Sequence, residues 1–87
     1  MAAILLILVV AEQFDISVEQ FHILRHIGQG QGSVSELAEI RKISRAAISQ
    51  AVEGLVTKGM ITRARDDRDR RNIRLTLTTS GSALLQT

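Results

Sequence analysis

The chain has 87 residues, enough for one small domain, and it contains no Cys, no Pro and only two Phe as large aromatic residues. These features exclude disulfides and thiolate metal sites, and they argue against a surface that stacks single-stranded bases. The net charge is only +2, yet residues 41–74 hold ten of the 11 basic residues. Such asymmetry is typical of a surface that binds a polyanion, and the alternative is an ordinary solvated surface.

The N-terminal segment predicts an apolar helix, because residues 1–11 read MAAILLILVVA. The run is shorter than the roughly 20 residues that cross a bilayer, and it lacks the basic start of a signal peptide. A membrane-attached or exported protein is therefore not expected. A helix that is apolar on every side must be buried against a partner. We assign residues 1–16 to an N-terminal helix that dimerises with the same helix of a second subunit.

Three helices are predicted next, each from the residue that can cap it. Ser17-Val18-Glu19-Gln20 and Ser33-Val34-Ser35-Glu36 have the form of capping boxes, and the Ser44 hydroxyl can cap a third helix. Gly28 ends the first of these helices and Gly59 ends the third. The second and third helices are separated by a turn of about three or four residues, which is the spacing of a helix-turn-helix pair.

A β-hairpin is predicted after Gly59. Residues 60–65 are extended in character, and residues 66–71 are all charged. Apolar residues then alternate with polar ones, as in a half-buried strand. These apolar residues are Ile73, Leu75 and Leu77.

A last helix is predicted from Thr78, which can cap it, although Gly81 is expected to weaken it. The fold class is thus mainly α with a small β-hairpin (α+β). Four helices are followed by two strands and the start of a final helix. Residues 17–87 form one domain, in which the helix-turn-helix pair is followed by the hairpin.

The helix over residues 44–58 has a small and polar outer face opposite its apolar stripe. Short side chains allow a helix to approach the bases of the major groove closely. In that groove Gln pairs with adenine, Arg with guanine and Ser with either kind of base edge. The alternative is a plain amphipathic surface helix. The candidate residues are Ser44, Arg45, Ala46, Ser49 and Gln50.

The predicted hairpin carries a dense run of arginines at its tip. Arg side chains can enter a narrow minor groove, where the negative potential is enhanced. The interspersed Asp residues can orient these arginines through bidentate pairs. The alternative is a solvated tip whose charges cancel. The basic residues are Arg65, Arg68, Arg70, Arg71 and Arg74, and the acidic ones are Asp66, Asp67 and Asp69.

The helix pair and the Arg hairpin, in this order, resemble the winged helix-turn-helix of the MarR family of bacterial and archaeal transcription regulators. The resemblance spans residues 15–85. It lies in SRAAISQ at 44–50, LVTKGMI at 55–61, DDRDRR at 66–71 and LTLTTSG at 75–81. The last two segments are similar to the family's wing pattern D-P-x-D-R-R and to the L-T-x-x-G that follows it.

The resemblance implies a sequence-specific transcriptional regulator of double-stranded DNA, most simply a repressor, that works in the cytoplasm as a homodimer on a pseudo-palindromic operator. The recognition helix maps to residues 44–50, and the wing Arg that enters the minor groove maps to Arg71, held by Asp69. A small-molecule effector is a further family property. The implied DNA contacts are Ser33, Ser35, Ser44, Arg45, Ala46, Ser49, Gln50, Arg65, Arg68, Asp69, Arg70, Arg71 and Arg74.

The sequence departs from the family in three places. Asp67 replaces the wing Pro, and Arg41 and Lys42 stand where the helix-turn-helix has an apolar residue and Gly. Family members also have long C-terminal helices that help to build the dimer. The present sequence ends inside the first of these, so we expect it to be C-terminally truncated relative to the family.

Other function classes find little support. His22 and His26 lie four residues apart, a spacing seen in zinc sites, but no third ligand stands nearby. No metal and no cofactor are expected. No Ser-His-acid or paired-carboxylate pattern indicates an enzyme. The alternative function is a winged-helix protein-interaction module that uses the apolar first helix and does not bind DNA.

Overall fold

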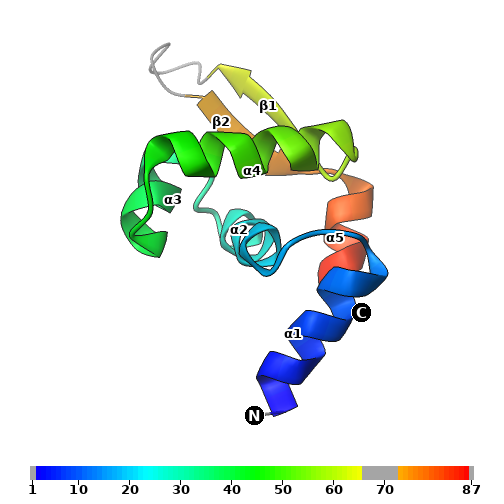
Figure 1. Cartoon of the computed structure of the whole chain (residues 1–87). Coiled ribbons are helices and arrows are strands. Elements are labelled where there is room, and N and C mark those ends of the chain that lie inside the picture. Colours follow the sequence, from blue (N-terminus) through cyan, green and yellow to red (C-terminus); the bar gives the residue numbers. More distant parts are fainter. Residues whose placement is uncertain (1, 66–72, 87) are drawn as a thin grey trace.

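Helix α2 lies at the centre of the molecule and contacts α1, α4, α5 and β2 (Figure 1). The computed structural model describes residues 2–65 and 73–86. The predicted fold class is confirmed. In chain order the elements are α1 (Ala2–Gln13), α2 (Val18–Gly28), α3 (Val34–Arg41), α4 (Arg45–Thr57), β1 (Ile61–Arg65), β2 (Ile73–Leu77) and α5 (Thr79–Leu85).

Local capping sets the starts of the helices, as the sequence predicts. Ser17 forms both bonds of a capping box with Gln20, and Ser44 accepts from the Ala47 N–H at 3.0 Å. The second predicted box is only half formed among the described residues, because Ser33 accepts from the Glu36 N–H without a return bond. The backbone at Ser33 forms an isolated bridge with β2 instead.

The core lies between α2, the helix pair α3–α4 and one face of the hairpin. Most of its side chains come from positions spaced three or four residues apart on the helices, so each helix presents one apolar stripe. The fully buried large residues are Ile23, Leu24, Leu37, Ile48, Val52, Leu55, Ile61 and Leu84.

The two strands pair antiparallel, with Ile61 opposite Leu77 and Arg63 opposite Leu75. The predicted half-buried stripe on β2 holds for Leu75 and Leu77 and is wrong for Ile73, which is 44% exposed. Ile73 lies at the end of β2 farthest from α5, where the hairpin extends past the core.

Gly81 allows α5 to pack closely against the rest of the domain. A Cβ at this position would lie 2.2 Å from the carbonyl oxygen of Met60, far inside van der Waals contact. Only a residue without a side chain lets α5 approach the backbone that follows α4 so closely. The cost of Gly to the helix is offset by this packing.

The turn between α3 and α4 is built without the expected Gly. Lys42 itself adopts the left-handed conformation, with φ at 56°, and its N–H donates to the Ala38 carbonyl. The preceding residue, Arg41, reaches back to α2 and pairs with Glu19 at 2.7 Å. The ion pair therefore fastens the turn to the centre of the domain.

Helix α1 extends away from the end of the molecule that carries α4 and the hairpin (Figure 1). Only its last turn joins the core, through Val10 and Ala11. The rest presents large apolar side chains to solvent. No helix in the described part of the chain is long and apolar enough to cross a membrane. The exposed residues of α1 are Ile4, Leu5, Leu6, Leu8 and Val9.

Candidate nucleic-acid interface

Helix α4 separates an apolar face from a polar one, as the sequence predicts. Ile48, Val52 and Leu55 are buried. The opposite face is open to solvent and carries small or polar side chains with no bulky residue, so another surface can approach it closely. Its exposed residues are Ser44, Arg45, Ala46, Ala47, Ser49, Gln50 and Glu53.

The N-terminus of α4 is tied to α3 by a side-chain contact. The Arg45 guanidinium donates to the Ser35 hydroxyl oxygen, which lies in the first turn of α3. Ser44 caps the same end of α4. Two of the predicted DNA contacts, Ser35 and Arg45, are thus brought together by the angle between the two helices.

The hairpin presents basic residues on the face that packs toward α4. Residues directly opposite in an antiparallel pair project to the same face, and alternate residues share a face. Arg63 therefore lies on the same face as the buried Leu75, and Arg65 lies two residues further out. Arg74 is on the other face of the hairpin, so the structure separates the predicted contacts Arg65 and Arg74.

One ion pair connects the hairpin to α4. Arg63 Nη1 lies 2.5 Å from Glu53 Oε2, and the two side chains are 43% and 59% exposed. Glu53 is on the polar outer part of α4, one turn beyond Gln50. The pair neutralises an acidic group on a surface whose other charges are mainly basic, and it links the angle of the hairpin to that of the helix.

Sequence reasoning missed the partnership of Glu53 with Arg63. Glu53 is placed on the outer face by its helical period, whereas Arg63 lies two residues after the buried Ile61 and shares its face of the strand. The sequence therefore indicates an exposed Glu53 but does not indicate where the Arg63 side chain ends. Their contact depends on how β1 crosses α4, which no local pattern encodes.

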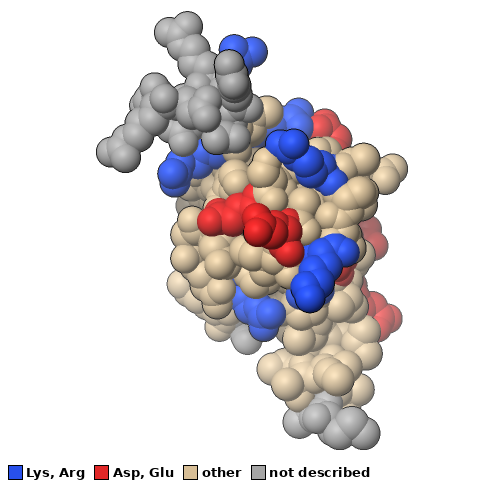
Figure 2. Space-filling model, turned by 90° about the vertical axis from the view of Figure 1, so that its left-hand side faces the viewer, with Lys and Arg blue, Asp and Glu red and all other residues tan. Residues whose placement is uncertain are grey.

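A polar groove of about 500 Å³ lies between the hairpin and α3. Arg74 stands on one side and the predicted phosphate donors Ser33 and Ser35 on the other, while Glu36 and Glu39 also line it. Figure 2 shows this side of the molecule, with acidic side chains near its centre and basic side chains around them. The two carboxylates oppose a phosphate inside the groove itself.

The tip of the hairpin lies outside the described residues. The predicted contacts Arg68, Asp69, Arg70 and Arg71 belong to it. The described part of the wing is its root, which carries Arg63, Arg65 and Arg74.

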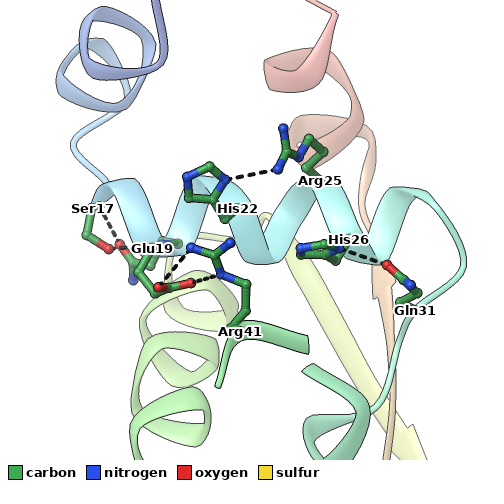
Figure 3. Close-up of polar contacts among 8 residues, drawn as sticks. Ser17, Glu19, His22, Arg25, His26, Gln31 and Arg41 are labelled. Atoms are coloured by element: carbon green, nitrogen blue, oxygen red, sulfur yellow. Dashed lines mark hydrogen bonds and ion pairs between the residues drawn. The ribbon is translucent and has the colours of Figure 1, made fainter. Parts of the chain in front are cut away.

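The exposed side of α2 carries a chain of polar contacts (Figure 3). Arg41 binds Glu19 through two nitrogens, at 2.7 and 3.3 Å. Arg25 donates to His22 Nδ1 at 3.2 Å, and His26 Nδ1 lies 2.8 Å from the Gln31 side-chain oxygen. Burial and the nearby Arg41 and Arg25 charges lower the pKa of His22 below 6.5.

The two histidines thus have separate hydrogen-bond partners. Across residues 2–65 and 73–86 the structure contains no group of three or more His, Cys, Asp or Glu side chains that could hold a metal ion.

The pair α3–α4, the hairpin after it and the polar face between them define a winged helix-turn-helix domain. The sequence model of the MarR family matches residues 14–72. The chain belongs to the MarR family.

Two curated relatives come from Bacillus subtilis (strain 168). The uncharacterized HTH-type transcriptional regulator YpoP is 40% identical over 73 residues, covering 83% of this chain and 52% of YpoP. The HTH-type transcriptional repressor YetL is 29% identical over 93 residues, covering 84% of this chain and 56% of YetL. The chain therefore spans about half the length of the curated relatives it matches.

A solved structure with the same fold is the S. aureus MepR–DNA complex. It superposes with a TM-score of 0.82 at 31% sequence identity, over 88% of this chain and 64% of MepR.

Proposed function

We propose that this chain is a sequence-specific transcriptional regulator that binds double-stranded DNA and acts as a repressor. The helix over residues 44–58 lies in the major groove, and the Arg-rich wing over residues 65–74 enters the minor groove. One observation carries the proposal. The polar face of α4 and the basic face of the hairpin adjoin one another and are joined by the Glu53–Arg63 pair, so one duplex can touch both.

The roles of individual residues follow from their positions. Ala46, Ser49 and Gln50 lie on the exposed face of α4 and approach base edges. Ser33 and Ser35 at the start of α3 donate to the sugar-phosphate backbone. Arg65 and Arg74 flank the wing, and the family motif assigns minor-groove entry to Arg71, held by Asp69, with Arg68 and Arg70 near phosphates.

The partners proposed are a pseudo-palindromic operator, a second copy of the chain and a small-molecule effector. The exposed apolar side of α1 supports the second copy, because such a surface is stable in water only when covered. The effector follows from family membership. The regulator works in the cytoplasm and is not an enzyme, which agrees with the curated relatives being transcriptional regulators.

Selection from random duplexes at a stated salt concentration tests the proposal, followed by affinity measurements on the selected site. Gln50→Ala is expected to change the preference at one base-pair position by about 1–3 kcal/mol. Arg71→Ala is expected to weaken binding to all duplexes and to reduce the slope of log affinity against log salt by about one.

Arg25→Ala serves as the control, because Arg25 is exposed on α2, on the side opposite α4 (Figure 3). It is expected to leave both the base preference and the salt slope nearly unchanged. If the wild-type dimer binds no duplex at low salt, the proposal is wrong. Salt-insensitive binding of a protein partner, retained after loss of the wing arginines, would support the interaction-module alternative.

A further inference from the structure

We propose that Arg45 and Ser35 form one phosphate-binding unit, so that Arg45 contacts the DNA backbone and does not read a guanine. The inference rests on the proposed function and assigns a different role to the first residue of the recognition helix. The geometry points to it through three features: the direction of the Arg45 side chain, the flank of α4 on which it lies and the chemistry left open at Ser35.

The Arg45 side chain is directed toward α3. Its Nη2 donates to Ser35 Oγ, ten residues earlier in the chain, across the angle between the two helices. Gln50 is five residues along α4 and makes no such contact with α3 in the described structure. The Arg45 guanidinium is therefore held at the edge of the helix pair. Smaller side chains occupy the outermost part of α4.

Arg45 lies on the flank of α4 that faces the wing. Residues spaced by four share one side of a helix, so Arg45, Ser49 and Glu53 are on a common flank. Glu53 on that flank contacts Arg63 of β1 at 2.5 Å. Arg45 thus stands on the side of α4 nearest to the hairpin.

This position matches a particular part of the duplex. The major and minor grooves are separated by a sugar-phosphate strand. A protein with α4 in one groove and the wing in the next must have that strand between them. Arg45 is exposed on the flank of α4 toward the hairpin, and Arg65 is on the hairpin face that carries Leu75, so the two residues are placed to lie on either side of that strand.

The charged groups that the structure describes near Arg45 and Arg65 favour an anion at Arg45. Within the described residues, Arg63 is paired with Glu53, and neither Arg45 nor Arg65 has a carboxylate partner. Glu36 and Glu39 line the groove beyond Ser35 and repel a phosphate that moves in that direction. The acids therefore confine an anion to the Arg45 side of Ser35.

The chemistry of the pair suits a phosphate. Ser35 Oγ accepts from Arg45, which leaves the Ser35 O–H free to donate, and the guanidinium keeps further N–H donors. Both groups can then donate to oxygens of one phosphate. A cation in the first turn of a helix is unfavourable for the helix itself, so an anionic ligand offsets this cost.

The test measures the affinity of variants for the selected duplex and for a panel with each base pair changed in turn. Arg45→Gln is expected to weaken binding about tenfold, which corresponds to the loss of one charge-assisted hydrogen bond. The factor is expected to be the same for every duplex of the panel. The slope of log affinity against log salt is expected to become shallower by about 0.9.

Ser35→Ala is expected to weaken binding uniformly without changing the salt slope, since no charge is lost. In the Arg45→Gln background it is expected to have little further effect, because the two groups act on one phosphate. Arg25→Gln is the matched control for charge loss, and Ser80→Ala on α5 is the matched control for hydroxyl loss. Circular dichroism verifies that each variant folds, and Arg45→Lys provides a second variant that keeps the charge and the salt slope.

Two outcomes overturn the inference while leaving the proposed function intact. One is a loss in Arg45→Gln that is confined to duplexes with one particular base, which means base readout. The other is unchanged affinity in Arg45→Gln while Gln50→Ala still alters base preference. If the wild-type protein binds no duplex, the proposed function fails and this inference fails with it.

Discussion

Lys42 adopts a left-handed backbone conformation that residues with a Cβ rarely adopt. It ends α3 with φ at 56°, in the left-handed region where a Cβ meets the following carbonyl oxygen. Its side chain is exposed, so a substitution removes little packing. Lys42→Gly is expected to raise the free energy of unfolding by about 0.5–1 kcal/mol, because relief of strain exceeds the added entropy of the unfolded chain.

Urea denaturation of both proteins measures this difference. Lys42→Ala provides the control, since Ala also has a Cβ and keeps the strain. An equal rise in the free energy of unfolding for Lys42→Gly and Lys42→Ala would mean that the Lys side chain, and not backbone strain, destabilises the wild-type protein.

His22 gives the domain a defined dependence on pH. Burial and the neighbouring Arg41 and Arg25 lower its folded-state pKa below 6.5, the value expected in the unfolded chain. Between these two pKa values the unfolded state binds more protons than the folded state, so stability rises with pH across that window. The contribution is complete above pH 6.5 and is lost as the pH falls through the folded-state pKa.

The expected result is that wild-type stability drops when the pH is lowered from 7 through this window, and that His22→Gln drops less. Thermal unfolding at a series of pH values measures both proteins. His26→Gln is the companion variant, because His26 contacts Gln31 and not an arginine. Parallel curves for wild type and His22→Gln would contradict the prediction.

At the scale of elements, the sequence predicts contacts between residues that are close along the chain. It does not predict contacts that depend on how the helices and strands pack. The caps at Ser17 and Ser44 are readable because donor and acceptor lie three residues apart. The exposure of Ile73 and the close packing at Gly81 are not readable from the sequence, because distant parts of the fold set both environments. Strand alternation does not reveal where the hairpin leaves the core. Helix propensity likewise does not reveal that the Met60 carbonyl lies against Gly81.

The candidate site divides in the same way. The exposed face of α4 follows from its helical period, and the basic charge of the wing follows from composition. The contact between Arg45 and Ser35 depends on the angle between α3 and α4, and that between Glu53 and Arg63 on the crossing of α4 and β1. Neither angle is encoded in a short stretch of sequence. These two side-chain contacts could therefore be identified only from the three-dimensional structure.

The Glu53–Arg63 pair makes a prediction about how two elements are coupled. It joins the helix to the wing at 2.5 Å, with both side chains roughly half exposed. Glu53→Gln and Arg63→Gln are each expected to lower stability by about 0.2–1 kcal/mol, and a double-mutant cycle is expected to give a coupling of similar size. Denaturation at low and high salt measures it, and added salt should reduce the coupling.

The Asp15–Lys58 pair is the matched control within the chain. Its atoms are 3.3 Å apart, and the Asp15 side chain is 99% exposed. The same cycle on this pair is expected to give no measurable coupling. Equal couplings for the two pairs would mean that the Glu53–Arg63 contact does not fix the wing against α4.

For the molecule as a whole, α1 and the hairpin lie toward opposite ends (Figure 1). Helix α1 carries the exposed apolar side chains, and the hairpin carries Arg63, Arg65 and Arg74. The molecule is 40 Å in its longest dimension, so one end can bind a second copy while the other contacts DNA. Two copies joined in this way present two recognition helices. A two-fold arrangement of this kind reads two half-sites about one helical turn apart.

The prediction is that α1 drives this pairing. Leu5 is 65% exposed and Val9 54%, and they lie one turn apart on the same side of the helix. Leu5→Glu combined with Val9→Glu is expected to convert a dimer at tens of micromolar into a monomer, because the introduced charges cannot be buried without partners. Light scattering measures the mass, and circular dichroism verifies that the domain remains folded.

Val18→Glu is the matched control, because Val18 is an exposed apolar residue of α2, 37% exposed. It is expected to leave the dimer intact. The Leu5→Glu, Val9→Glu double variant should still bind a single half-site, with the salt dependence of one domain. It should lose the steep dependence of full-operator binding on protein concentration. A wild-type protein that is monomeric at tens of micromolar would show that something other than a second copy covers α1.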